Sequence, residues 1–269
     1  MRGATRYLRL LAAFARYGLA RELTFRGNFL VKVLVEVLWL GILLVFYRTV
    51  FAKTSVVAGW SEPEYLFFVG CYFALEGIIE TLFLENCNEF ADLVRTGDLD
   101  FILLKPIDEQ FLVSCRWIEW STAPNVLMGA AVMGIALHDL QWTFDLGQVL
   151  LFAGMFTCGI GIAYSFMLLL TSASVWLVRN QSLYELWWLF TSLVRYPKEI
   201  YRGKWASPMG WFFTFVVPIL LVVNVPARTM VKSLDPAFLA FMAGTAVVLL
   251  FASRVLFQYA LRRYRSASS

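Results

Sequence analysis

The chain has 269 residues, of which 60% are hydrophobic and 16% are charged, and its mean hydropathy is +0.68. A soluble domain carries about 45–50% apolar and roughly 25% charged residues, so these fractions exclude a soluble domain and predict one all-α membrane domain over residues 1–269. The net charge of +4 comes largely from the two termini. Beside a membrane span, such a bias favours a role in setting topology over nucleic-acid binding.

The first predicted element is an interfacial helix over about residues 2–23. At helical spacing its arginines gather on one face and apolar side chains on the other, which is typical of a helix that lies in the membrane interface. The two faces consist of Arg2, Arg6, Arg9 and Arg16, and of Tyr7, Leu8, Leu11 and Phe14. No small-residue cleavage site follows a short apolar core, so we expect no cleaved signal peptide.

Apolar segments of spanning length follow this helix. A hydrocarbon core about 30 Å thick needs around 20 residues of helix. The uncharged run over residues 146–178 would form a helix about 50 Å long, so we predict a turn within it at residues 171–174. The predicted spans cover about residues 28–50, 65–84, 111–137, 146–170, 175–195 and 236–261.

The apolar segment over about residues 206–227 is predicted to enter the membrane without crossing it. It contains Pro208, Pro218 and Pro226, each of which removes a backbone donor and disfavours a continuous helix. A seventh crossing would also place the arginines of the two termini on opposite sides of the membrane. We therefore predict six spans, cytoplasmic termini and an extracytoplasmic re-entrant hairpin before the last span.

With this topology, the loop over about residues 85–110 is cytoplasmic, and it includes the charged stretch LVRTGDLDFILLKPID. We expect Asn88 to cap a short helix whose Phe90, Leu93 and Val94 form an apolar patch. Gly97 suits the left-handed end of that helix, and Asp98 begins a second element that Pro106 ends. Two interpretations remain open: the loop folds against its own headgroup layer, or it seats in a groove of a separate cytoplasmic protein.

Two motifs carry a family resemblance. The segment RTGDLDFILLKP resembles a pattern of Gly, Leu-Asp, Leu-Leu, a basic residue and Pro, and RYPKEIY with the later VVPI and NVPA resembles a second signature. Both are similar to a branch of the ABC-2-type membrane subunits of ATP-binding cassette exporters, a branch once catalogued as a domain of unknown function. The order of elements is also similar: an elbow helix, six spans, a coupling helix between spans two and three, and a re-entrant pair before span six.

The resemblance implies the partners and the energy source. It implies two permeases, identical or homologous, that carry two cytoplasmic ATP-binding cassette subunits and move a hydrophobic, amphipathic or lipid-like substrate outward. The chain has no GxxxxGK[ST] loop, so we expect no enzyme activity and no cofactor here, with ATP and Mg used by the partner subunit. The residues expected to couple to that subunit are Glu89, Phe90, Leu93, Arg95, Gly97, Asp98, Leu99, Asp100, Lys105 and Pro106.

Ionisable residues inside predicted spans each need a physical reason, because burial in the bilayer costs at least about 2.5–3.5 kcal/mol. Lys32 and Glu36 share a face of span one, and Glu76 and Glu80 share a face of span two. One interpretation is a buried ion pair between Lys32 and Glu76 or Glu80; the other is a cavity in which Glu36 or Glu76 touches a polar or cationic substrate.

Further charged and aromatic residues fall near the ends of spans three and five. Arg116 and Glu119 are expected to pair within one helix or to contact the ATPase side. Glu185, Trp188 and Arg195 form an interfacial belt or the wall of a substrate path. Lys32, Glu36, Glu76, Glu80, Glu185, Trp188 and Arg195 are thus candidates for buried pairs or a translocation path.

Two other functions compete with the exporter. A proton- or ion-coupled secondary transporter would use the intramembrane glutamates as a relay, but such carriers often contain internal repeats and none is found here. A membrane-embedded enzyme is disfavoured by the single histidine and the lack of HExxH or GxSxG motifs.

Overall fold

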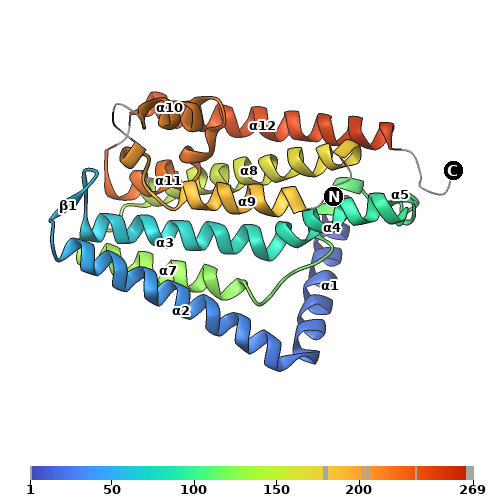
Figure 1. Ribbon diagram of the computed structural model, residues 1–269, viewed down its shortest axis with the longest axis horizontal. Helices are drawn as coiled ribbons and strands as arrows, with labels where there is room; N and C mark the ends of the chain where they lie inside the picture. The colour runs from blue at the N-terminus through green and yellow to red at the C-terminus, as the bar shows by residue number, and fades with distance from the viewer. Residues whose placement is uncertain (1, 178–180, 202, 204–205, 234, 265–269) are drawn as a thin grey trace.

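The computed structural model describes residues 2–177, 181–201, 203, 206–233 and 235–264. They form an all-α protein with one small hairpin of two strands (Figure 1). The elements are α1 (Arg2–Thr24), α2 (Arg26–Phe51), β1 (Val56–Val57), β2 (Trp60–Ser61), α3 (Glu62–Ile79), the π-helical turn η1 (Glu80–Leu84), α4 (Glu85–Thr96), α5 (Leu99–Leu103), α6 (Glu109–Cys115), α7 (Ala123–Asp139), α8 (Leu146–Leu177), α9 (Gln181–Val194), the 3-10 turn η2 (Lys198–Tyr201), α10 (Ser207–Phe215), the 3-10 turn η3 (Pro218–Leu220), α11 (Leu221–Val231) and α12 (Pro236–Arg263).

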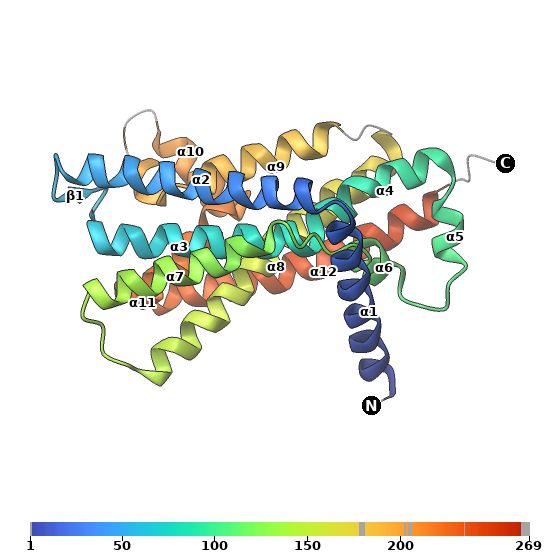
Figure 2. The ribbon, with the colours of Figure 1, turned by 90° about the horizontal axis from the view of Figure 1, so that it is seen from below.

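The long helices run roughly side by side, so the bundle has two distinct ends (Figure 1). One end carries β1, β2, α10 and α11, and we call it the hairpin end. The opposite end carries α4, α5 and the last turns of α12, and we call it the α5 end. Helix α1 lies toward the α5 end and runs across the direction of the other helices in both views (Figures 1 and 2). The bounds of α1 agree with those predicted for the interfacial helix.

Helix α3 forms the centre of the core. Phe67, Phe68 and Phe73 are fully buried on it, as expected for a helix that is apolar on all sides. Its contact with α7 is close because Gly70 and Gly129 face each other, and a methyl group at either position would overlap the backbone of the other helix. Small residues at such contacts let two membrane helices approach closely.

The membrane-span prediction is confirmed at the level of an apolar helical bundle. Within the described part of the chain, four helical stretches are long and apolar enough to cross a bilayer: α2, the continuous run Glu62–Thr96, α8 and α12. The bent pair of α10 with η3 and α11 would make a fifth if it crossed. The remaining predicted spans correspond to α7, with 17 residues, and α9, with 14 described residues.

The turn predicted at residues 171–174 is wrong. Helix α8 continues through these residues to Leu177, and residues 178–180 are outside the described part of the chain. The hydroxyl groups of Thr171, Ser172 and Ser174 donate to the carbonyl oxygens of Met167, Leu168 and Thr171. Because these polar groups are satisfied within the helix, they do not need to end it.

The predicted boundaries of span three are also wrong. The segment over 111–137 is divided into α6 and α7, with a non-helical stretch between Cys115 and Ala123. A residue that is distant in the sequence holds this stretch in place: Glu22 of α1 accepts a hydrogen bond from the Trp120 backbone N–H at 2.6 Å. Pro124 lies in the first turn of α7, where its missing N–H costs no helical hydrogen bond.

The segment between α9 and α12 begins and ends at the hairpin end. Near its start, Glu199 of η2 accepts a hydrogen bond from Trp60 of β2 at 3.1 Å. After its last helix, Lys232 forms an ion pair of 3.0 Å with Glu64 in the first turn of α3. Between these contacts, the chain bends by 80° between α10 and the helical stretch Pro218–Val231. Pro218 begins η3 at this bend.

Candidate functional site

The α4–α6 segment at the α5 end contains all the residues predicted to couple to a partner, but it does not present them as predicted. The helix that carries Asn88 runs without interruption from α3 through η1 into α4, so Asn88 caps nothing. Nearby Asn86 is buried, and its side chain exchanges hydrogen bonds with the backbone N–H and C=O of Trp117. The polar group that sequence reasoning assigned to a helix start therefore lies within a helix.

The predicted apolar patch of Phe90, Leu93 and Val94 is buried, which corrects the prediction that it faces a partner. It packs with Leu99, Ile102, Leu112, Val113, Leu168 and Phe257, which come from α5, α6, α8 and α12. The rings of Phe90 and Phe257 lie 5.7 Å apart. An amphipathic helix at a bundle end buries its apolar face against the nearest helices, and here that face serves the protein's own core.

A different apolar pair is exposed at the tip of this segment. Phe101 is 68% and Leu104 80% exposed, whereas Leu99 and Ile102 on the opposite face of α5 are buried. The sequence analysis did not identify this pair. The spacing of three residues between Leu99 and Ile102 places those two on one face of a helix, which leaves Phe101 and Leu104 on the other face. The remaining exposed coupling candidates surround it: Arg95, Asp98, Lys105 and Pro106.

The turn between α4 and α5 has the conformation that the sequence predicted. Gly97 ends α4 with φ of 83°, in the left-handed region that glycine adopts at little cost. Asp98 then begins α5, and its carboxylate accepts from the Thr96 hydroxyl at 2.7 Å. Of the other two candidates, Glu89 pairs with Arg116 at 2.5 Å and Asp100 lies in the first turn of α5.

The C-terminal side of the tip is tied to two other parts of the protein through Asp108. The Asp108 carboxylate caps α6 by accepting from the Phe111 N–H and also accepts from Arg254 of α12. Its backbone N–H donates to the Tyr7 hydroxyl of α1 at 3.2 Å, and Arg6 donates to the Pro106 carbonyl at 3.0 Å. The hydrogen bond from Arg254 holds the pKa of Asp108 below its usual value.

An open cavity of about 370 Å³ lies between α2, α3 and α9, and exposed Leu38, Ile42 and Trp188 form part of its wall. It brings together four of the ionisable candidates of the predicted spans, Glu36, Glu76, Glu80 and Arg195, with Trp188 and Trp39 beside them. An adjoining cavity of about 420 Å³ shares Glu36 and Glu80 and extends to Lys32, Glu85 and Glu119. Glu185 is exposed and lines neither cavity.

The ion-pair partners predicted for Lys32 and for Arg116 are wrong. Lys32 forms its ion pair with Glu119 at 2.5 Å and not with Glu76 or Glu80, and Arg116 pairs with Glu89 and not with Glu119. The reason is that residues 116–122 are not helical, so the spacing of Arg116 and Glu119 does not place them on one helical face.

Two carboxylates of the cavity accept hydrogen bonds from neutral side chains. Glu36 accepts from the Asn125 amide at 3.0 Å, and Glu76 accepts from the Tyr72 hydroxyl at 2.7 Å. The Arg195 guanidinium lies over the ring of Trp39, with its carbon 5.1 Å from the ring centre. The arrangement combines acidic, cationic and aromatic groups around one cavity and can therefore accept a polar or amphipathic molecule.

The second signature motif has a structural explanation at the hairpin end. Glu199 of RYPKEIY accepts hydrogen bonds from Asn224 at 3.0 Å and Arg228 at 2.9 Å, and Asn224 begins the NVPA motif. Burial raises the pKa of Glu199, but the hydrogen bonds from Asn224 and Trp60 outweigh it and lower the pKa below the usual value. The two motifs thus meet in one ionised network.

A comparison with protein-family models supplies the family. The model described as ABC-2 family transporter protein matches residues 37–268. Searches of the curated proteins and of the solved structures found no match. The matched range contains the α5 tip and the Glu199 network, and it contains Glu76, Glu80 and Arg195 of the cavity but not Glu36. The chain therefore belongs to the ABC-2 family of transporter proteins and is a multi-pass membrane subunit of the permease type, which works with ATP-binding cassette subunits.

Proposed function

We propose that the chain is the permease subunit of an ATP-binding cassette exporter that moves a hydrophobic, amphipathic or lipid-like substrate by alternating access. The subunits that bind and hydrolyse ATP with Mg are separate chains, two per complex. Outward transport follows from the resemblance of the motifs to exporters. The exposed pair Phe101 and Leu104 is the observation that carries the proposal, because the two side chains form an apolar surface at the tip of the bundle.

The proposed topology has six crossings in the cell membrane, made by α2, α3 with η1, α7, α8, α9 and α12. Helix α1 lies in the cytoplasmic interface as the elbow helix, and the α5 end faces the cytoplasm. The contacts of Glu199 with Trp60 and of Lys232 with Glu64 support a re-entrant segment, because they hold its entry and its exit at one end of the bundle. Six crossings leave both termini on the cytoplasmic side.

In the proposed mechanism, the tip of α5 docks on the ATP-binding subunit as the coupling helix. Movement of the tip reaches the membrane by two routes: through Asp108 to Arg254 on α12, and through Arg6 and Tyr7 to α1. The buried face of the same segment supports this, because Phe90 and Leu99 fix the tip to α8 and α12. A rigid connection of this kind transmits displacement, whereas a solvated loop absorbs it.

Two variants with a matched control test the docking. Phe101→Ala with Leu104→Ala removes the exposed contact, and Leu127→Ala removes a similarly exposed leucine, 74% exposed, on α7. Each protein is co-expressed with tagged candidate ATP-binding subunits and purified through the tag. We expect the double variant alone to lose co-purification and transport-linked ATP hydrolysis. Unchanged association of the double variant would show that α5 is not the docking element.

We further propose that Glu36, Glu76, Glu80 and Arg195 line the substrate path. The exposed face of α2 beside this path includes Leu34, Leu38 and Ile42, and a second permease, identical or homologous, would close it. Glu76→Gln should lower transport while leaving the melting temperature unchanged; normal transport would remove Glu76 from the path. Transport that runs on an imposed pH gradient without ATP-binding subunits would instead favour a secondary carrier that uses these glutamates.

A further inference from the structure

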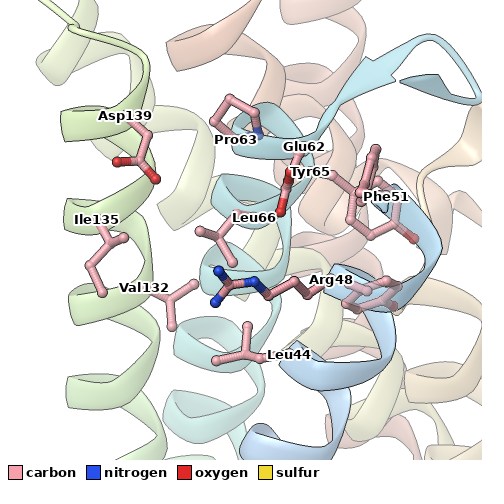
Figure 3. Close-up of a pocket in the computed structure, with 11 residues that line it drawn as sticks. Leu44, Arg48, Phe51, Glu62, Pro63, Tyr65, Leu66, Val132, Ile135 and Asp139 are labelled. Atoms are coloured by element: carbon pink, nitrogen blue, oxygen red, sulfur yellow. The ribbon is translucent and has the colours of Figure 1, made fainter. Parts of the chain in front are cut away.

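The hairpin end contains a third cavity, separate from the two glutamate-lined cavities. It has a volume of about 540 Å³ and lies between the ends of α2, α3 and α7. Its lower walls are apolar and include Leu44, Leu66, Val132 and Ile135 (Figure 3). No group in this cavity takes part in the coupling tip or in the cavity around Glu76.

Three charged side chains line the same cavity: Arg48, Glu62 and Asp139. Figure 3 shows the Arg48 side chain extending from α2 into the cavity, with the carboxylates of Asp139 and Glu62 beyond it. Among the described residues, the Arg48 guanidinium has no ion-pair or hydrogen-bond partner. A guanidinium beside an apolar surface can bind a molecule that has an anionic group attached to an apolar part.

The depth of the charges selects a particular kind of headgroup. Arg48 lies three residues before the last residue of α2, which is about 4.5 Å of helix, whereas Glu62 and Asp139 are the terminal residues of α3 and α7. Figure 3 likewise shows the Arg48 guanidinium farther along the helices, away from their hairpin-end termini, than the two carboxylates. In a phospholipid with an amine headgroup, the phosphate is likewise nearer to the acyl chains than the ammonium group is.

We propose that this cavity binds one zwitterionic phospholipid from the surrounding membrane. Arg48 pairs with the phosphate, Glu62 and Asp139 pair with the ammonium group, and Leu44, Leu66, Val132 and Ile135 contact the upper parts of the acyl chains. A purely anionic phospholipid satisfies Arg48 but brings negative charge toward the two carboxylates, so the cavity discriminates against it. Binding requires neither ATP-driven transport nor a particular direction of transport.

The test measures lipid affinity directly. The full-length protein in detergent is titrated with phosphatidylethanolamine or phosphatidylglycerol of identical acyl chains, and native mass spectrometry reports the bound fraction. We expect phosphatidylethanolamine to bind more tightly to the wild type. Arg48→Ala should weaken binding of both lipids roughly tenfold, because each loses a charge-assisted contact to its phosphate. Lys53→Ala removes an equal charge from an exposed residue outside the cavity and should change neither affinity.

Two further variants separate headgroup recognition from occupancy. Glu62→Gln with Asp139→Asn should weaken phosphatidylethanolamine and strengthen phosphatidylglycerol, which reverses the preference. Ile135→Trp fills the cavity from an exposed position and should weaken both lipids. Melting temperatures show that each variant is folded, and Arg48→Gln replaces Arg48→Ala if the latter is not. Equal binding of the two lipids to the wild type, or affinities unaffected by the Arg48 substitution, would overturn the proposal.

Discussion

Arg254 on α12 donates to both carboxylate oxygens of Asp108, with distances of 2.9 Å from Nη1 to Oδ1 and 2.5 Å from Nη2 to Oδ2. The two residues are separated by 146 positions in the sequence. A bidentate contact of this kind fixes orientation as well as distance. It therefore joins the start of α6 to the last helix of the membrane domain. Loss of this contact should destabilise both elements.

Asp108→Asn should lower the free energy of unfolding by about 1 kcal/mol. The substitution retains an acceptor for the Phe111 N–H at the start of α6 but removes the charge that Arg254 binds, and the pair is partly exposed. The measurement is a double-mutant cycle with Arg254→Gln, read from thermal unfolding in detergent. If the two substitutions are additive, the side chains are not energetically coupled.

The same pair predicts an acid-dependent stability. Arg254 lowers the pKa of Asp108 in the folded protein, so the carboxylate stabilises the fold above its unfolded pKa of about 3.9, and this stability is lost as the pH falls through the folded pKa. The melting temperatures of the wild type and Asp108→Asn should differ by a constant amount from pH 7 to 5. The difference should shrink toward pH 3; a difference that grows in acid would contradict the assignment.

Glu199→Ala should destabilise the hairpin end by about 3 kcal/mol or more, because it leaves the Arg228 charge and the donors of Trp60 and Asn224 without their acceptor. Thermal unfolding with intrinsic tryptophan fluorescence measures the change. Glu185→Ala is the matched control, since it removes an exposed glutamate from α9 and should stay within about 0.5 kcal/mol of the wild type. Equal effects of the two substitutions would show that the Glu199 network does not stabilise the fold.

The two faces of α5 should respond oppositely to truncation. Leu99 is fully buried, so Leu99→Ala should cost about 2–5 kcal/mol of folding free energy. Phe101→Ala removes an exposed ring and should leave the melting temperature nearly unchanged while weakening association with the ATP-binding subunit. A large loss of stability in Phe101→Ala, with association intact, would mean that the exposed ring supports the fold and does not bind a partner.

The sequence by itself determined the class of protein and the position of most helices. Composition and apolar run length reflect the solvent that surrounds a chain, so they indicated a membrane bundle without knowledge of any contact. Local backbone preferences were also predictable from the sequence. The left-handed Gly97, the helix start at Asp98 and the bend near Pro218 each follow from a single residue and its neighbours. The motifs around Gly97 and Pro197 also indicated the family that the comparison with family models confirmed.

The tertiary structure decided which side chains are paired and which are exposed. Lys32 pairs with Glu119, and Phe90 is buried while Phe101 is exposed, because helices from distant parts of the chain pack against one face of each element and not the other. Spacing along a helix shows which residues share a face but not which face meets a neighbour. The break between α6 and α7 also depends on a distant contact, because Glu22 of α1 accepts from the Trp120 backbone N–H. The continuation of α8 past residue 174 is local, since the hydroxyl groups there donate to carbonyl oxygens of the same helix.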